Sequence, residues 1–409
     1  MKLKDLAFYV RERVNTDLID TNNYVSTENM LPNKNGITIA TSIPDVLSVS
    51  KFTKNDVLIS NIRPYFQKIW FADKDGGCSN DVLVVRVKED CNPLFLYYLL
   101  SNSLFFEYVM SSAKGTKMPR GDRNSIMQYS VPDFSLEIQR KISHILCVLD
   151  EKIRVNKQIN DNLELQAQAL FKSWFVDFEP FQDGEFVDSE LGRIPKGWKV
   201  STISNYIEKT LSGDWGKDNL VGNYTQKVYC IRGADIPSIK YGYKGKMPTR
   251  YILEKNFLQK QLNSNDIVIE ISGGSPTQST GRCCFISNSI IERYDKGLIC
   301  TNFCRALTSQ KELSLFIYYY LNFLYEKGVM FTYENGTTGI KNLDLNNLIN
   351  TELMIIPPKD LLSEFNLIAC NTTNAIQRNG LENEKLSQLR DTLLPKLMSG
   401  EISVEEIEI

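Results

Sequence analysis

Polar and basic loops are the parts of this sequence whose residue types and spacing suit chemistry with nucleic acid. One loop, residues 114–123, concentrates four cations and two glycines between an expected helix and an expected strand. Another, residues 61–65, follows an expected strand. Glycines let the backbone approach a phosphate, and lysine or arginine neutralises phosphates or reads guanine edges. The candidate DNA contacts in these two loops are Arg63, Lys114, Lys117, Arg120 and Arg123.

Loops of the same kind return in the second half of the chain. Residues 336–342 correspond to the first loop and residues 272–282 to the second. Asparagine, glutamine and arginine side chains have the bidentate geometry that distinguishes adenine and guanine in the major groove. One such loop is more often plain solvated surface, but repetition in both halves favours a shared function. The candidates in this half are Arg232, Gln278, Arg282, Lys341 and Asn342.

Catalytic motifs are missing from the sequence. It has no GxxxxGK[ST] phosphate loop, no GxGxxG after a strand and no HExxH. With His144 as the one histidine, a histidine-based triad or metal cluster is not favoured. A nuclease alternative stays open, because Asp133, Asp150 and Lys152 supply the two carboxylates and the lysine of a metal-dependent site. The last two lie beside the apolar stripe of an expected helix, however, where charged flanks are usual. We therefore expect no catalytic residue and no metal site.

Cysteine usage and hydrophobicity indicate a cytoplasmic protein without membrane contact. Nine cysteines form no CxxC pair and no regular framework, as expected of reduced thiols. The group Cys283, Cys284, Cys300 and Cys304 has the ligand types of a zinc site, but use as small buried hydrophobes is favoured. The longest apolar stretch, residues 313–325, is shorter than the about 20 residues that span a bilayer.

The net charge of −2 conceals an uneven distribution. Residues 1–132 carry 16 basic and 14 acidic side chains, and residues 185–357 carry 20 and 17. Residues 133–184 carry 6 and 9, and residues 358–409 carry 5 and 9. Because a DNA-binding surface is local, overall acidity does not exclude one on the two mildly basic segments.

The chain contains an internal repeat. LFLYYLL at 94–100 returns as LFIYYYL at 315–321, and Cys78-Ser79-Asn80 returns as Cys300-Thr301-Asn302. The run at 55–59 is likewise answered at 265–269. A shift of about 221 residues indicates a duplicated domain rather than a solenoid unit. We therefore expect two similar modules with approximate twofold character and two similar binding faces.

Each copy closes with a long helical pattern whose apolar residues recur near the 3.5-residue period of a coiled coil. A shift of 223 residues superimposes Ile153 on Ile376 and Asn156 on Asn379. Asn156 and Asn160 lie on or beside the stripe, as register-fixing polar residues can. The two stripes are buried most simply in an antiparallel pair. The residues that we assign to this helix pair and spacer are Ile142, Ile145, Leu149, Ile153, Leu163, Leu170, Trp174, Phe365, Ile368, Ile376, Leu386, Leu393 and Leu397.

The modules themselves indicate an α+β fold, with two similar mixed α/β domains separated by two long antiparallel coiled-coil helices. Strands are expected at 56–60, 68–72, 81–88, 126–131, 266–271, 283–286 and 352–356. Aromatic helices are expected at 93–112 and 313–331. The expected domains are module one at 1–132, the first long helix at 133–180, a linker and module two at 181–357, and the second long helix and C-terminal tail at 358–409.

Signature-like segments accompany this organisation at 24–30, 191–198 and 231–236, together with Gly-Thr pairs at 115–116 and 336–337. With the alternation of two modules and two long helices, they make the chain resemble the DNA specificity subunit of a Type I restriction–modification system. The resemblance covers essentially the whole chain. Because recognition domains differ widely within that family, no base contact is carried over from it.

The resemblance implies a division of labour. Each module would be a target recognition domain that reads one half of a bipartite, asymmetric sequence in double-stranded DNA. The helices would fix the gap and dock two methylation subunits, which carry S-adenosylmethionine and modify adenine. Motor-nuclease subunits would use ATP and Mg²⁺, and this subunit would be non-catalytic and hold no cofactor. The alternatives are the self-contained metal-dependent nuclease and a stand-alone two-headed DNA-binding repressor.

Overall fold

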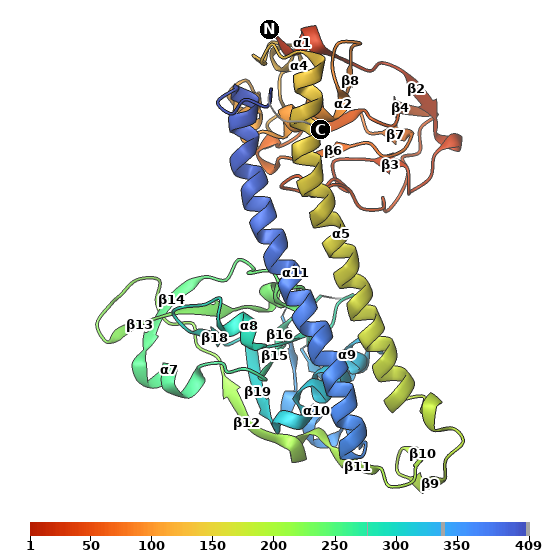
Figure 1. Ribbon diagram of the computed structural model, residues 1–409, viewed down its shortest axis with the longest axis vertical. Helices are drawn as coiled ribbons and strands as arrows, with labels where there is room; N and C mark the ends of the chain where they lie inside the picture. The colour runs from red at the N-terminus through yellow and green to blue at the C-terminus, as the bar shows by residue number, and fades with distance from the viewer. Residues whose placement is uncertain (276, 337–339, 406–409) are drawn as a thin grey trace. The chain divides into compact units, whose positions relative to one another are not determined.

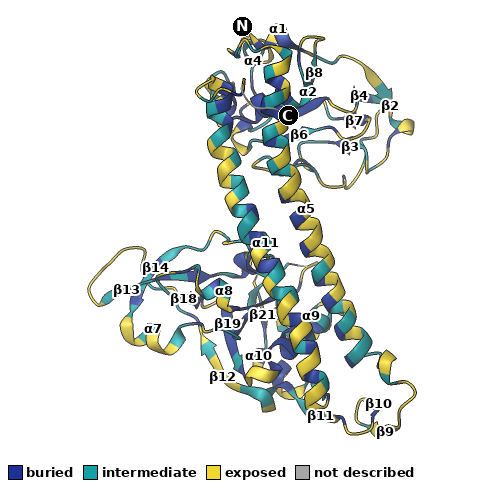
Figure 2. Cartoon of the chain, in the orientation of Figure 1, coloured by how far each residue is buried: buried dark blue, intermediate teal, exposed yellow. Residues whose placement is uncertain are grey.

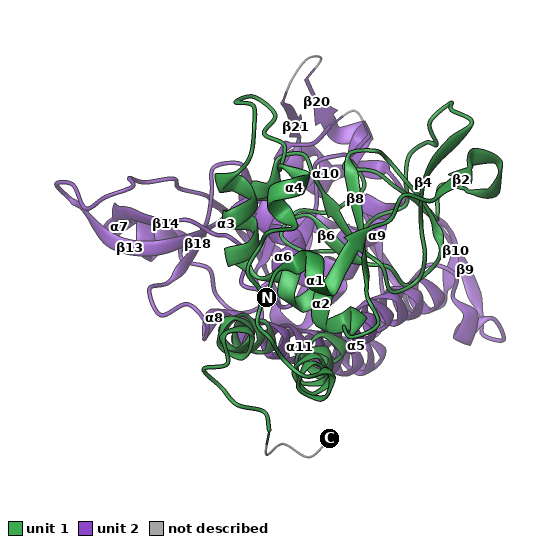
Figure 3. Ribbon diagram, turned by 90° about the horizontal axis from the view of Figure 1, so that it is seen from above, with its two compact units in different colours: residues 1–152, 386–409 green, residues 153–385 purple. Residues whose placement is uncertain are grey.

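The computed structural model describes residues 1–275, 277–336 and 340–405, and Figure 1 shows its elements. The chain divides into two compact units, residues 1–152 with 386–409 (unit 1) and residues 153–385 (unit 2), as Figure 3 shows. Each unit has hydrophobic clusters made of its own residues. The two modules are therefore separately packed bodies. Within the described residues, no helix is long and apolar enough to cross a bilayer.

Unit 1 contains two four-stranded sheets and four short helices. In sheet order, the first sheet consists of β1 (Ala7–Tyr9), β8 (Val82–Val87), β5 (Val57–Ser60) and β6 (Ile69–Phe71). The second consists of β2 (Arg13–Asn15), β4 (Ser48–Phe52), β7 (Gly76–Cys78) and β3 (Tyr24–Val25). The helices are α1 (Leu3–Leu6), α2 (Pro93–Ser101), α3 (Ser103–Ser111) and α4 (Arg123–Ile126).

Unit 2 repeats this plan with additions. Its four-stranded sheet consists of β12 (Ile207–Ser212), β19 (Cys304–Ser309), β15 (Ile267–Glu270) and β17 (Cys283–Phe285). A three-stranded sheet consists of β14 (Thr249–Leu253), β13 (Tyr224–Ile231) and β18 (Leu298–Cys300). The smaller sheets comprise β16 (Ser272–Gly273), β21 (Lys341–Leu343), β20 (Glu334–Asn335), β11 (Lys199–Thr202), β22 (Leu353–Ile356), β9 (Phe186–Ser189) and β10 (Gly192–Pro195). The short helices are α6 (Ile236–Lys240), α7 (Glu254–Lys260), α8 (Asn288–Ile291), α9 (Ser314–Glu326) and α10 (Leu345–Thr351).

Strand order confirms the internal repeat. The order β1-β8-β5-β6 corresponds element by element to β12-β19-β15-β17, and all pairings in both sheets are antiparallel. The turns that precede β5 and β15 agree in detail. Asn55 and Asn265 have left-handed backbones, with φ of 74° and 76°. In each turn the following aspartate accepts a backbone N–H at 2.7 Å, from Thr53 in unit 1 and from Asn263 in unit 2.

The two long helices are α5 (Leu136–Phe175) and α11 (Lys359–Ser399), and buried residues recur along both (Figure 2). In unit 1 the start of α5 packs against the end of α11, with Ile142 and Leu397 in one cluster. In unit 2 the end of α5 packs against the start of α11, where the rings of Phe175 and Phe365 lie 5.1 Å apart. The helices are therefore antiparallel in each unit, as predicted.

Four asparagines form hydrogen bonds across the helix pair in unit 2. Asn156 donates to Asn383 and Asn379 donates to Asn160, both at 2.9 Å. The 223-residue shift converts the first of these hydrogen bonds into the second, so the repeat extends to hydrogen bonding. Asn156, Asn160 and Asn383 are each 1% exposed. These buried amides pair across the two helices, and Asn156 also donates to Glu382, so the hydrogen bonds specify the helix register.

The structure also corrects three expectations. No strand occupies residues 126–131, because Ile126 ends the short helix α4, which Asp122 caps, and residues 127–131 pair only through the isolated bridge between Ser130 and Lys2. The expected first aromatic helix is two helices, because the Asn102 side chain caps the second one, α3, by accepting the backbone N–H of Leu104. Ile368 is 38% exposed and lies outside the buried stripe, where Phe365 and Ala369 are buried instead. Of the other assigned helix residues, Ile142, Ile153, Ile376 and Leu397 are buried.

Candidate nucleic-acid interface

One turn occurs at the same position in both modules and organises the loops around it. In unit 1 it follows β7, which pairs in parallel with β3, and in unit 2 it follows β18, which pairs in parallel with β13. The N–H of Ser79 donates to Val25, and that of Thr301 to Ile231, both at 2.9 Å. Two residues after Ser79 and Thr301 stand Asp81 and Phe303. The duplicated backbone thus holds different side chains in equivalent places.

In unit 1 the two predicted loops pack together beside this turn. Residues 114–120 form a hairpin closed by two hydrogen bonds of 3.0 Å between the backbones of Lys114 and Arg120. The N–H of Arg63 donates to Pro119 at 2.8 Å. Gly121 fills a position where a Cβ would meet Val109 at 2.7 Å, so a side chain there would separate the loops. The structure therefore brings together candidates that are far apart in sequence.

Four of the five candidate cations of unit 1 are exposed, whereas Arg63 is half-buried and its Nε has no hydrogen-bond partner among the described residues. Arg120 pairs with Asp81 at 3.1 Å and Lys114 pairs with Asp122 at 3.0 Å. Arg123 donates to the carbonyl of Asn80 at 3.0 Å, and Lys117 is exposed between the two ends of the hairpin. The Arg120 side chain is 57% exposed and that of Lys114 is 82% exposed. Ion pairs this exposed contribute little to stability, so these cations are available to phosphates.

Asp122, the acidic residue of this loop, accepts several hydrogen bonds. Backbone N–H groups, first that of Ser125, and the ammonium of Lys114 lower the pKa of the Asp122 carboxyl to about 2. The carboxylate thus stays charged and holds Lys114 on the same side of the loop.

In unit 2 the predicted cations are bound to buried carboxylates. Arg232 forms a two-point contact with Asp235, through Nε at 2.8 Å and Nη2 at 3.1 Å. Arg282 contacts Glu270 through two hydrogen bonds of 2.8 Å, and Lys341 pairs with Glu334 at 2.8 Å. The three acceptor carboxylates are at most 6% exposed. These cations therefore stabilise the loops of module two, which differs from the arrangement in module one.

The remaining candidates of module two lie on neighbouring strands and loops. Asn342 accepts a hydrogen bond from Ser272, which joins β21 to β16. Gln278 is exposed, and its amide lies 3.1 Å from the guanidinium of Arg282 when its oxygen faces that group. Thr337, Thr338 and Gly339 of the second Gly-Thr loop, and Pro276 of residues 272–282, lie outside the described residues.

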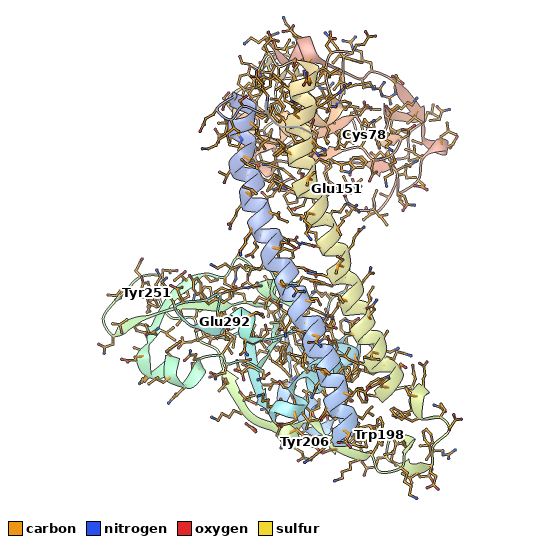
Figure 4. All side chains as sticks on the ribbon, in the orientation of Figure 1. Cys78, Glu151, Trp198, Tyr206, Tyr251 and Glu292 are labelled. Atoms are coloured by element: carbon orange, nitrogen blue, oxygen red, sulfur yellow. The ribbon has the colours of Figure 1, made fainter. Side chains whose placement is uncertain are left out.

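A hollow adjoins the duplicated turn in each module. In unit 1 it is lined mainly by polar groups of residues 24–29, residues 38–44, Ser79 and Asp81. In unit 2 it is lined by residues 232–234, Glu270, Ser272, residues 301–303 and Trp215. Trp215 and Phe303 did not enter the sequence prediction, because nothing in the sequence marks an aromatic side chain as exposed. Figure 4 labels Cys78, at the end of β7, and Tyr251, on β14.

Asp150 of the nuclease alternative is engaged in other contacts, and the cysteines of the zinc alternative are buried. The carboxylate of Asp150 accepts from Tyr98 at 2.8 Å and from Arg390 at 2.6 Å, all within unit 1. From the start of α5 at Leu136 to Asp150 the helix rises roughly 20 Å, so Asp133 cannot share a metal ion with Asp150. Burial raises the pKa of the Cys283 and Cys300 thiols to about 12, as expected of small apolar side chains. Within the described residues, no cluster of His, Cys, Asp and Glu could hold a metal ion.

Comparisons with known proteins agree with this geometry. The sequence model of the Type I restriction modification DNA specificity domain matches residues 2–165. The MjaIX Type I restriction enzyme specificity subunit of Methanocaldococcus jannaschii is 31% identical over 325 residues, which cover 76% of this chain and 70% of that protein. The HindI specificity subunit of Haemophilus influenzae is 24% identical over 98% of both chains. In fold, a crystallised S subunit from M. genitalium aligns over 97% of this chain and 95% of its own length, with a TM-score of 0.55 and 18% identity.

Proposed function

This chain belongs to the family of Type I restriction–modification DNA specificity subunits, and we propose that each of its modules reads one half of a divided, asymmetric DNA sequence. The observation that carries the proposal is the duplicated turn, around which both modules gather their loops. Unit 1 presents exposed cations there, and unit 2 presents exposed aromatic rings. Two modules that share this backbone but present different side chains suit two half-sites of different sequence.

On this proposal the subunit is non-catalytic and the rest of the reaction belongs to its partners. Two methylation subunits that carry S-adenosylmethionine would dock on the helix pair, and motor-nuclease subunits that use ATP and Mg²⁺ would complete the assembly. The engagement of Asp150 by Tyr98 and Arg390 supports a structural role for the helix residues rather than a catalytic one.

Mapping methylated adenines tests the proposal in a genome that carries the chain and its methylation subunit. We expect one motif in two parts, with a fixed gap between them. Arg120→Ala should relax or weaken the part read by module one, by about 1–3 kcal/mol if Arg120 contacts a base. A continuous motif, or no motif that depends on this chain, would contradict the proposal.

Lengthening both helices tests whether they set the gap. Four residues inserted after Lys152 and after Lys385, where the two units meet along the chain, keep every contact inside each unit in register. Four helical residues add about 6 Å, roughly the rise of two base pairs. The methylated motif should therefore tolerate a gap longer by about two base pairs, and an unchanged gap would exclude the helices as the ruler.

A further inference from the structure

Two exposed aromatic rings in unit 2 stand at the rim of one hollow. Phe303 is 56% exposed and Trp215 is 41% exposed, and both line the hollow beside the turn after β18. Exposed aromatic rings that lie together mark binding surfaces, because exposing them to water is unfavourable. The hollow, of about 460 Å³, has room for a nucleobase but is far too small for a protein partner.

Trp215 is held rigidly in this exposed position. The Arg250 guanidinium lies over its ring, 4.2 Å from the centroid, and Arg250 Nε donates to its carbonyl at 2.7 Å. The flanking glycines fix the segment, since a Cβ would lie 1.9 Å from the Thr301 carbonyl at Gly213 and 2.2 Å from the Tyr251 carbonyl at Gly216. Arg250 is 5% exposed, so the stacked face is closed and the other face of the indole remains for a ligand.

The backbone of Phe303, which lines the same hollow, is fixed by two hydrogen bonds. Its carbonyl accepts from Ile271 at 2.9 Å and from Ser272 at 3.2 Å. Gly233 and Glu270 line the same hollow and are tightly packed, because a Cβ on Gly233 would lie 2.2 Å from Glu270 Oε1. Since Glu270 pairs with Arg282, an apolar group that enters the hollow would meet two aromatic rings and no unpaired carboxylate.

The equivalent position in module one has different chemistry. Asp81 occupies the place of Phe303, and its carboxylate pairs with Arg120. The hollow beside it is lined by Ser26, Thr27, Asn29 and other polar residues. One module thus offers hydrogen-bonding groups where the other offers aromatic rings.

From this juxtaposition we propose that Phe303 and Trp215 recognise a thymine in the half-site of module two, with its methyl group against the two rings. In the major groove, the thymine methyl is the apolar feature that an aromatic side chain can contact. The assignment rests on the proposed function, because it supposes that this hollow faces DNA. Module one, with Asp81 and Arg120 at the same place, reads its bases by hydrogen bonds instead.

Deoxyuridine substitution tests the assignment, because it removes only the methyl group. The assembled complex with its methylation subunits is titrated with duplexes that carry the mapped motif, each with one thymine replaced by deoxyuridine. One thymine in the half-site of module two should lower wild-type affinity by about fourfold when replaced, as expected for one buried methyl-sized group. Phe303→Ala should remove that difference and Phe303→Leu should retain part of it, while no substitution in the other half-site should respond to either variant.

Matched controls separate the possible failures. Leu258→Ala, which truncates a 75% exposed side chain on α7, should bind as the wild type does. If wild type binds the divided motif and Phe303→Ala and Trp215→Ala keep full sensitivity to deoxyuridine, the thymine assignment is wrong and the proposed function stands. Equal weakening on unrelated DNA would also overturn it, since that result identifies a backbone contact. If wild type binds no divided motif, the proposed function itself fails.

Discussion

Replacing Asn156 by alanine tests the polar centre of the helix pair in unit 2. Its amide donates to Asn383 Oδ1 at 2.9 Å and to Glu382 Oε2 at 2.7 Å, and the residue is 1% exposed. A neutral hydrogen bond contributes about 1 kcal/mol and one to a charged group about 1.5–3 kcal/mol. Because both are lost together, we expect the free energy of unfolding to fall by about 2–4 kcal/mol.

The repeat supplies an internal comparison. Asn379 is the equivalent residue on the other helix, but it is less buried, and within the described part of the chain its side chain donates to Asn160 alone. Asn379→Ala should therefore cost about 1 kcal/mol. Urea unfolding followed by tryptophan fluorescence measures both, because Trp174 and Trp198 lie in unit 2.

The control and the refutation come from the same helices. Asn162→Ala, at an exposed site on α5, should leave stability unchanged or raise it slightly, since alanine favours the helix. In a double-mutant cycle, Asn156→Ala and Asn383→Ala should couple by about 1 kcal/mol. Additive effects of those two variants, or an Asn156→Ala variant as stable as the wild type, would refute the hydrogen bond as a stabilising contact.

Three further predictions concern packing, charge and thiols. Gly380→Ala should destabilise by about 1–3 kcal/mol, measured by urea unfolding, although alanine is the better helix former, because its Cβ would lie 2.5 Å from the backbone of Gly242. Arg282→Met should cost about 3–5 kcal/mol by leaving the buried Glu270 carboxylate unpaired, and adding Glu270→Met should recover part of that loss in the same assay. At pH 8 a thiol reagent should modify the exposed Cys370 quickly, and Cys283 and Cys300 only on unfolding. Burial raises the pKa of the Cys283 and Cys300 thiols from 9 to about 12. The contribution of these thiols to stability is therefore present below pH 9 and lost between pH 9 and 12, which a pH series of unfolding midpoints measures.

The repeat was readable from the sequence because it recurs in strands and turns whose backbones need particular residues. Asn55 and Asn265 are examples, since asparagine tolerates the left-handed backbone better than most residues. The helices were readable because their apolar spacing is regular. The error at 126–131 arose because this short stretch has the residue pattern of a strand, whereas Ile126 ends the helix that Asp122 caps and the rest pairs only through the isolated bridge between Ser130 and Lys2. Ile368 was misplaced because a 3.5-residue pattern cannot choose between adjacent apolar residues on one helix.

The candidate interface was only partly readable, for a different reason. Sequence identifies a cation but not its partner, and the partner decides whether the cation is available. Lys114 and Arg120 are themselves exposed and have partly exposed partners, whereas Arg232, Arg282 and Lys341 bind carboxylates that are buried. Arg232, Arg282 and Lys341 therefore remain predicted DNA contacts, and each already has a structural role as the partner of a buried carboxylate.

Duplication and divergence together account for an asymmetric reader. The backbone contacts of the turn, those of Ser79 and Thr301, are the same in both modules, and their loss would disturb two strands at once. The side chains two residues later are not needed for these strand contacts, since Asp81 and Phe303 are partly exposed and line the hollows beside the turns. Exchanging them is therefore the sharpest test of how the two halves differ. Phe303→Asp should abolish the thymine preference of module two without unfolding it, because the removed ring is more exposed than buried; loss of the folded unit would show instead that the ring is part of the core.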